Sequence, residues 1–123
     1  MRCRLPVEAP DQVRGGVYPW LTVAQQTAFM GHFVYIMASR PGGAIYIGRT
    51  GNLAARVEAH RAGASVHTAK YKIRTLVWFE CHEDFNTSLQ RERAIKRWPR
   101  AWKNALIAER NPNWQDVTSH IPV

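Results

Sequence analysis

Two short β-rich segments on either side of a turn most constrain the fold of this chain. Residues 33–38 (Phe-Val-Tyr-Ile-Met-Ala) are continuously apolar, which is typical of a strand buried on both faces. Pro41-Gly42-Gly43 then favours a turn, and residues 44–48 (Ala-Ile-Tyr-Ile-Gly) can return as a second strand. The sequence therefore predicts a β-hairpin, whose two strands must pair in antiparallel fashion.

The rest of the chain predicts one more strand and three helices. We expect the strand at residues 74–80, the helices at 52–62, from about 87 to 98 and at 100–109, and a polar loop at 64–72. Asn52 is a suitable N-cap, Thr87-Ser88-Leu89-Gln90 has the pattern of a capping box, and Pro99 should break the helical run. Trp98, Trp102 and Trp114 are expected in the core. Three strands and three helices, with a hairpin first, predict an α/β or α+β sandwich.

The chain is long enough for one domain, and its N-terminal part differs from the rest. Residues 1–29 are rich in Pro and Gly and have no sustained period, so we predict a flexible or dispensable extension before a domain at 30–123. Met30 is then a candidate for the natural start. The alternative is an arm that packs Trp20, Leu21 and Phe29 on the domain.

The charge of the chain indicates a polyanionic partner. The sequence has 17 Lys and Arg against 9 Asp and Glu, and residues 31–123 carry most of the excess. Such a balance favours nucleic acid first and an anionic membrane surface second, while a charge that is incidental stays an alternative. No apolar run approaches the length of a membrane helix and no signal pattern is present, so we predict no membrane partner. The two cysteines, Cys3 and Cys81, are not expected to form a structural disulfide, and we predict a reduced, cytoplasmic environment.

Five side chains suited to phosphodiester hydrolysis follow in order along the chain. Tyr35 ends the first strand motif, Tyr46 opens Tyr-Ile-Gly, and Arg56, His60 and Glu92 come later. Arg56 and His60 are four residues apart and share a helix face. Two phenols, a guanidinium, an imidazole and one carboxylate are the groups that a one-metal hydrolase needs for proton transfer and for charge stabilisation.

The order and spacing of these residues over about residues 32–118 resemble the GIY-YIG nuclease superfamily, especially its small stand-alone bacterial members. The first motif departs from the family pattern, because Phe33 and Val34 replace Gly and Ile. The resemblance implies a three-stranded antiparallel sheet flanked by helices, and a divalent-metal-dependent endonuclease that hydrolyses DNA, with a role in DNA repair or recombination.

The resemblance also implies a role for each motif residue. We predict Tyr35 as the general base and Tyr46 as its orienting or phosphate-binding partner, although the reverse assignment stays open. Arg56 would grip the scissile phosphate and His60 would relay a proton. Glu92 would be the single protein ligand of one Mg²⁺ or Mn²⁺ ion, with water and phosphate oxygens completing the shell.

Further residues are expected to contact the nucleic acid. Arg49 follows the second motif directly, and Lys70, Tyr71 and Arg74 are predicted to line the groove. A family asparagine matches Asn104 or Asn111, and we favour Asn111. DNA is the expected partner, with RNA not excluded and a protein partner left open as the source of specificity; the oligomeric state is expected to be a monomer or weak dimer. The rival interpretation is a nucleic-acid-binding module that uses the same basic groove without cutting.

Overall fold

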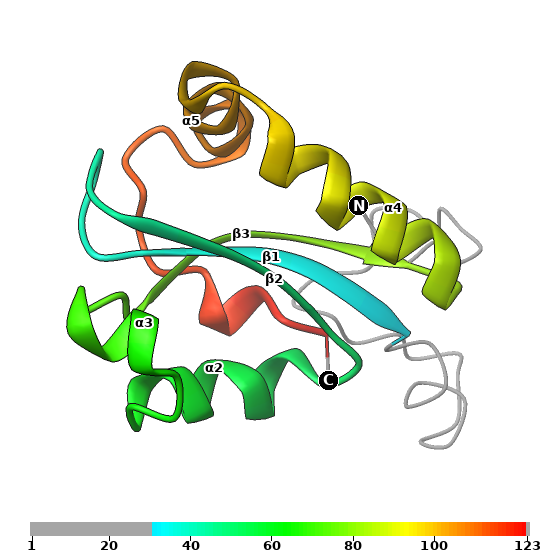
Figure 1. Cartoon of the computed structure of the whole chain (residues 1–123), viewed down its shortest axis with the longest axis horizontal. Helices are drawn as coiled ribbons and strands as arrows, with labels where there is room; N and C mark the ends of the chain where they lie inside the picture. Colours follow the sequence, from blue (N-terminus) through cyan, green and yellow to red (C-terminus); the bar gives the residue numbers. More distant parts are fainter. Residues whose placement is uncertain (1–30, 123) are drawn as a thin grey trace.

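A computed structural model describes residues 31–122 of the chain. The predictions made for residues 1–29 therefore lie outside the described residues. The elements, in order, are β1 His32–Ala38, β2 Ile45–Thr50, α2 Leu53–Arg61, α3 Val66–Lys70, β3 Thr75–His82, α4 Phe85–Arg97, α5 Arg100–Arg110 and a 3-10 helix at Thr118–His120 (Figure 1). In this part of the chain no helix is long and apolar enough to cross a membrane.

The sheet has three antiparallel strands in the order β2-β1-β3, which confirms the predicted fold class. The first two strands form the predicted hairpin, and their register places Tyr35 opposite Gly48 and Met37 opposite Tyr46. Since paired residues on neighbouring strands point to the same face, Tyr35, Tyr46 and Gly48 share one face of the sheet. The register thus brings both motif tyrosines together.

Helices cover both faces of the sheet, as Figure 1 shows with α2 and α3 on one side and α4 and α5 on the other. One core joins alternate residues of β1 to α2, and includes Phe33, Tyr35, Met37, Leu53 and Val57. The other core joins the intervening residues of β1 to α4 and α5, and includes Val34, Ile36, Ala38, Ile95 and Ile107. Burial on two faces explains why the sequence of β1 is continuously apolar.

The start of α4 differs from the sequence prediction. Asp84 is the N-cap, because its carboxylate accepts a hydrogen bond from the main-chain N–H of Thr87 at 2.8 Å. The helix therefore begins at Phe85, and the capping box predicted at Thr87 is wrong. Both Asp and Thr suit a cap, and the local pattern alone did not distinguish them.

The predicted loop at 64–72 contains the short helix α3. Ser65 is its N-cap and accepts from the main-chain N–H of Thr68 at 3.4 Å. A five-residue helix has too few positions for a recognisable apolar period, so its polar sequence looked like a loop. This helix matters because it carries Thr68, which is fully buried, toward α2.

Residues after α5 complete both cores. Trp114 packs in the α4–α5 core and Ile121 in the α2 core, while the main-chain N–H of Val117 donates to Leu76 O at 2.8 Å. The tryptophan prediction is confirmed for Trp114. It is wrong for Trp102, which is 59% exposed on α5 because it points away from the buried Ile107.

Candidate active site

The two hairpin tyrosines meet above Gly48. Their ring centroids lie 6.2 Å apart. A Cβ atom on Gly48 would lie 2.6 Å from the Tyr35 hydroxyl oxygen and 2.9 Å from Cε2 of Tyr46, both closer than Cβ contacts in proteins. The glycine of Tyr46-Ile47-Gly48 is therefore needed for space, because only a residue without a side chain lets the two phenols converge here.

The two tyrosines differ in solvent access. Tyr35 has no exposed surface, whereas Tyr46 is partly exposed. Burial and the neighbouring Tyr46 raise the pKa of Tyr35 above its ordinary value, while the Arg56 guanidinium opposes that rise. Tyr35 consequently keeps its proton near neutral pH, and Tyr46 presents the phenol that a ligand can reach.

His60 connects Tyr35 to the loop after α2. The Tyr35 hydroxyl lies 2.8 Å from His60 Nε2, and His60 Nδ1 lies 3.2 Å from the hydroxyl oxygen of Thr68. The Thr68 hydroxyl donates its own hydrogen to Ser65 O at 3.2 Å. Its oxygen must then accept from His60 Nδ1–H, which leaves Nε2 with a lone pair that accepts the Tyr35 hydrogen.

The surroundings of His60 keep it neutral. Burial, and to a smaller extent the Arg56 charge, lower the pKa of His60 from its ordinary value. A protonated ring would have two donors and would lose its acceptor for Tyr35. The neutral ring, buried between α2 and the hairpin, thus fixes the direction of the hydrogen-bond chain from Tyr35 through His60 to Thr68 and Ser65.

An aromatic row leads from this chain to the surface. The ring centroid of Tyr46 lies 4.9 Å from that of His60 and 6.3 Å from that of His67, and His67 lies 5.0 Å from Tyr71. Lys70 Nζ is 5.4 Å from the Tyr71 centroid. The predicted groove residues Lys70 and Tyr71 are exposed, on α3 and directly after it, and His67 lies between Tyr71 and Tyr46 in this row.

Arg56 and Glu92 approach Tyr35 from helices on opposite faces of the sheet. Arg56 is exposed on α2, and Glu92 is on α4 with 14% of its side chain exposed. The charges of both residues act on the pKa of Tyr35, Arg56 lowering it and Glu92 raising it. Tyr35, Tyr46 and His60 are therefore in contact with one another, while Arg56 and Glu92 act on Tyr35 electrostatically from α2 and α4.

Glu92 is the one predicted metal ligand. Its carboxylate currently pairs with Lys96 Nζ at 3.0 Å. Within residues 31–122, no three His, Cys, Asp or Glu side chains come together as a metal-binding group. A site of one carboxylate suits Mg²⁺ or Mn²⁺, which retain several waters and bind substrate oxygens, and does not suit zinc, which takes three or four protein ligands.

Two of the remaining predicted nucleic-acid contacts, Arg49 and Asn111, lie elsewhere. Arg49 is paired with Val34 and so is on the opposite face from Tyr46, where its guanidinium stacks 4.3 Å from the Phe85 centroid. Arg74 is exposed beyond α3. Asn111 donates to Val77 O at 2.9 Å and Gln115 O at 2.8 Å and accepts from Gln115 N–H at 3.0 Å.

These contacts give Asn111 a structural role that the prediction missed. Both of its amide hydrogens and its carbonyl oxygen are used on the main chain, and the residue is buried at the end of α5. The prediction that Asn111 contacts nucleic acid has no support in this geometry. Asn104, the alternative match, accepts from Arg100 Nε at 2.8 Å on the outer part of α5.

Sequence reasoning also missed Thr68 and His67. Thr68 orients His60, yet a lone threonine in a polar segment has no signal that separates it from a solvated residue. For His67, the sequence showed only that a histidine lies four residues before Tyr71, and it did not indicate a contact with Tyr46. The structure brings His67 into the aromatic row because α3 folds back against α2, a contact between segments that the sequence pattern does not encode.

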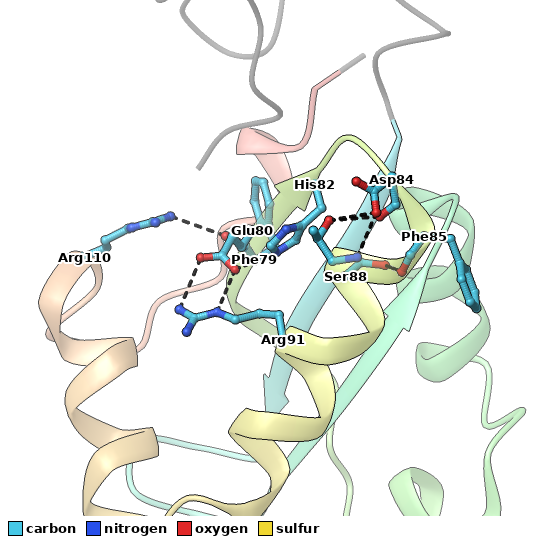
Figure 2. Close-up of polar contacts among 9 residues, drawn as sticks. Phe79, Glu80, His82, Asp84, Phe85, Ser88, Arg91 and Arg110 are labelled. Carbon is cyan, nitrogen blue, oxygen red and sulfur yellow. Dashed lines mark hydrogen bonds and ion pairs between the residues drawn. The ribbon is translucent and has the colours of Figure 1, made fainter.

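A second group of titratable side chains lies at β3 and the start of α4, as Figure 2 shows. Glu80 accepts from Arg91 Nε at 2.9 Å and Nη2 at 3.3 Å, and lies 2.8 Å from His82 Nε2. Burial opposes ionisation of Glu80, but Arg91 and His82 outweigh it and hold the pKa of Glu80 below its usual value. Both carboxylate oxygens are engaged, so this group fastens α4 to β3 and offers no reactive atom.

Comparison with known proteins agrees with this geometry. The family model of the GIY-YIG catalytic domain matches residues 31–105. The UPF0213 protein of Staphylococcus aureus strain Mu3 / ATCC 700698 is 41% identical over 83 residues, which cover 64% of this chain and 96% of that protein. Proteins of the same family name in strains Mu50 / ATCC 700699 and N315 match to the same extent.

No solved structure matches the chain. The family model spans more than half of the chain, and its limits enclose the hairpin, α2, α3, β3 and α4, which carry all five predicted site residues. The chain therefore belongs to the GIY-YIG catalytic-domain family.

Proposed function

We propose that this protein is a divalent-metal-dependent endonuclease that hydrolyses phosphodiester bonds of nucleic acid, with DNA as the first candidate substrate. The observation that carries the proposal is the buried hydrogen-bond chain Tyr35–His60–Thr68, which holds one member of a tyrosine pair where the charges of Arg56 and Glu92 act on it. The second tyrosine of the pair, Tyr46, is partly exposed to solvent. A role in DNA repair or recombination is part of this proposal.

We assign the base role to Tyr46 in place of Tyr35. Tyr35 has no exposed surface and its pKa is raised, so it is poorly suited to take a proton from water. Tyr46 is reachable by solvent and touches the same His60 ring. In this assignment Tyr35 holds His60, and His60 packs against the ring of Tyr46 and positions it.

Arg56 and Glu92 serve the phosphate. Arg56 is exposed beside the tyrosine pair and can bind two phosphoryl oxygens through its planar guanidinium. Glu92 would hold the metal ion once Lys96 moves aside, which this lysine can do because about half of its side chain is exposed to solvent. A bound divalent ion would stabilise the negative charge that develops on the phosphoryl oxygens.

One observation favours a second candidate, a binding module that does not cut. Glu92 already has a cationic partner at 3.0 Å, so its carboxylate has a structural explanation. In a module of this kind Lys70, Tyr71 and Arg56 would hold nucleic acid, and Glu92 would only reduce the positive charge of α4.

A cleavage assay separates the two candidates. We would incubate labelled duplex, single-stranded and flapped DNA, and matched RNA, with Mg²⁺ or Mn²⁺. Glu92→Gln should abolish cutting while binding without metal stays equal or tightens, and the exposed Glu109→Gln is the matched control that should behave as wild type. Cutting at the wild-type rate by folded Glu92→Gln would refute the metal-ligand role, and wild-type binding without cutting on every substrate would favour the module.

Tyrosine variants test the assignment of the base. Tyr46→Phe should slow cleavage by about 10²–10⁴-fold, the usual effect of losing a general base. Tyr71→Phe controls for the loss of a nearby hydroxyl and should change the rate little. If Tyr35→Phe is crippling and Tyr46→Phe is mild, then Tyr35 is the base, as the sequence first suggested.

A further inference from the structure

The outer surface of α4 and the first turn of α5 carry positive charge that the candidate active site does not use. Residues 91–108 contain six Lys and Arg and one acid, Glu92. Two of the six cations bind groups outside these two helices: Arg91 binds Glu80, and Arg100 binds the main-chain oxygens of Gly42 and Gly43. The others are Arg93, Lys96, Arg97 and Lys103.

Helix electrostatics explain only part of this charge. Lys96 and Arg97 lie in the last turn of α4, where the helix dipole favours cations. Lys103 lies near the start of α5, where the dipole disfavours a cation and the first turn contains no acid. Arg93 and Arg97 are like charges at i,i+4, which destabilises a helix, and neither makes a hydrogen bond or ion pair among residues 31–122.

An exposed tryptophan accompanies these cations. Trp102 is 59% exposed, and its ring centroid lies 5.9 Å from that of the half-buried Trp98 in a T-shaped arrangement. Within the described residues it is one of four large apolar side chains with such exposure. An exposed aromatic ring on a helix that also carries cations is a combination with which proteins hold polynucleotides, because the ring stacks on bases and the cations meet phosphates.

Hydrogen bonds connect this surface to the candidate active site and hold it in place. Lys96 Nζ lies 3.0 Å from the Glu92 carboxylate, and Lys103 Nζ donates to Lys96 O at 3.2 Å, so contacts lead from Glu92 through Lys96 to α5. Arg100 ties the start of α5 to the turn between β1 and β2. A surface fixed to the sheet in this way can bind an extended ligand without first being ordered.

We propose that Arg93, Lys96, Arg97, Lys103 and Trp102 form a second polynucleotide-binding surface, which holds the strand beyond the phosphate at the active site. The cations meet successive phosphates, and the Trp102 ring packs on a base or sugar. The identity of the ligand rests on the proposed function. An anionic membrane also attracts cations and tryptophan, but the continuity of this surface with Glu92 favours nucleic acid.

The test measures binding in EDTA, where no cutting takes place. The double variant Arg93→Gln/Arg97→Gln should bind a labelled oligonucleotide about tenfold more weakly, and its log–log salt slope should be smaller by about 1 to 2, since each phosphate contact contributes about 0.7 to 0.9. Lys72→Gln/Arg110→Gln is the control of equal net charge, with both residues exposed and outside the proposed surface. It should keep more of the affinity and of the slope.

Tryptophan variants provide the second arm. Trp102→Ala should weaken binding by roughly 5- to 150-fold, the range for loss of one base–aromatic stack, and Trp102→Phe should restore most of it. Thermal melts establish that each variant is folded. If Trp102→Ala does not fold, the charge variants decide alone, because Arg93 and Arg97 are exposed and make no hydrogen bond or ion pair with the residues that the structure describes.

Three outcomes would overturn the inference: equal losses in the two double variants, no effect of folded Trp102→Ala, or binding to phosphatidylserine vesicles without binding to the oligonucleotide. Because the assay needs no catalysis, the two proposals can fail separately. A protein that binds through this surface but never cuts supports this inference and refutes the nuclease. A protein that cuts, and whose surface variants bind as the control does, refutes only this inference.

Discussion

Replacing Gly48 by alanine should test how the two phenols are brought together. The new Cβ atom would lie 2.6 Å from the Tyr35 hydroxyl oxygen, 2.7 Å from Tyr35 Cζ and 2.9 Å from Tyr46 Cε2. Tyr35 has no room to retreat, because it is fully buried and is packed among the core residues that join β1 to α2. The methyl group must therefore displace a ring or bend the hairpin.

The cost of Gly48→Ala follows from two contributions. Overpacking a well-packed core costs about 1–3 kcal/mol. A displaced Tyr35 also lengthens its 2.8 Å hydrogen bond to His60, and a hydrogen bond of this kind contributes about 1 kcal/mol. We expect a loss of about 2–4 kcal/mol in the free energy of unfolding, and a domain of this size loses roughly 4–8 °C in Tm per kcal/mol.

Urea denaturation followed by tryptophan fluorescence measures this loss. Gly51→Ala is the matched control, because its Cβ would meet nothing closer than Gly31 O at 3.9 Å. Where the backbone is compatible, Gly→Ala stabilises by about 0.4–1 kcal/mol through the unfolded state, so the control should be unchanged or slightly more stable. Cleavage by folded Gly48→Ala should also fall, since the tyrosine pair is disturbed.

A double variant identifies the atoms responsible. Tyr35→Phe removes the oxygen that lies nearest to the new methyl group, although the contact with Cζ remains. Part of the Gly48→Ala penalty should therefore disappear in the Tyr35→Phe background, with a coupling energy on the order of 1 kcal/mol. Strict additivity of the two changes, or a Gly48→Ala protein as stable as wild type, would refute the spatial explanation of the motif glycine.

Three further predictions concern the buried polar groups. Burial and Arg56 lower the pKa of His60, so the unfolded state binds the proton more readily than the folded state, and the free energy of unfolding should fall as pH drops below about 6.5. Thermal melts from pH 8 to 4 should show a smaller decrease in Tm for His60→Gln than for wild type. Thr68→Val should cost about 1–3 kcal/mol, because His60 Nδ1–H loses a buried acceptor, and ¹⁵N NMR of the imidazole should detect a change of tautomer that Thr68→Ser does not cause. Asn111→Ala should lower the free energy of unfolding by about 2–4 kcal/mol in urea titrations, because three hydrogen bonds are lost. The folded variant should bind an oligonucleotide with unchanged affinity and salt slope; a selective loss of affinity would support the predicted binding role.

Much of the fold could be read from local patterns. The continuous apolar run of β1, the Pro-Gly-Gly turn and the Pro99 break are local signals, and the structure has a strand, a turn and a helix boundary at these places. Asn52 also caps α2 as predicted, by accepting from Ala55 N–H at 3.1 Å. Such features depend on a few neighbouring residues, whose conformational preferences act before any tertiary contact forms.

The candidate site was predicted as a set of residues, but their roles depend on packing. The resemblance of their order and spacing to the GIY-YIG superfamily identified Tyr35, Tyr46, Arg56, His60 and Glu92 as a set. The sequence contained no signal for the difference between the two tyrosines. Only the register of the hairpin and the cover provided by α2 decide that Tyr35 is buried and Tyr46 is reachable.

Tertiary structure also decided which polar residues face solvent and which are used inside. Asn111 and Arg49 are residue types that often contact nucleic acid. In this fold, however, Asn111 hydrogen-bonds to the main chain, and Arg49 stacks on Phe85 on the face of the sheet opposite Tyr46. Trp102 is a residue type expected in the core, yet it is exposed. The sequence by itself determined the strands, the longer helices and the chemical groups available, because those depend on local preference and residue type. The solvent access and partners of each group depend on contacts between distant segments, which only the folded chain brings together.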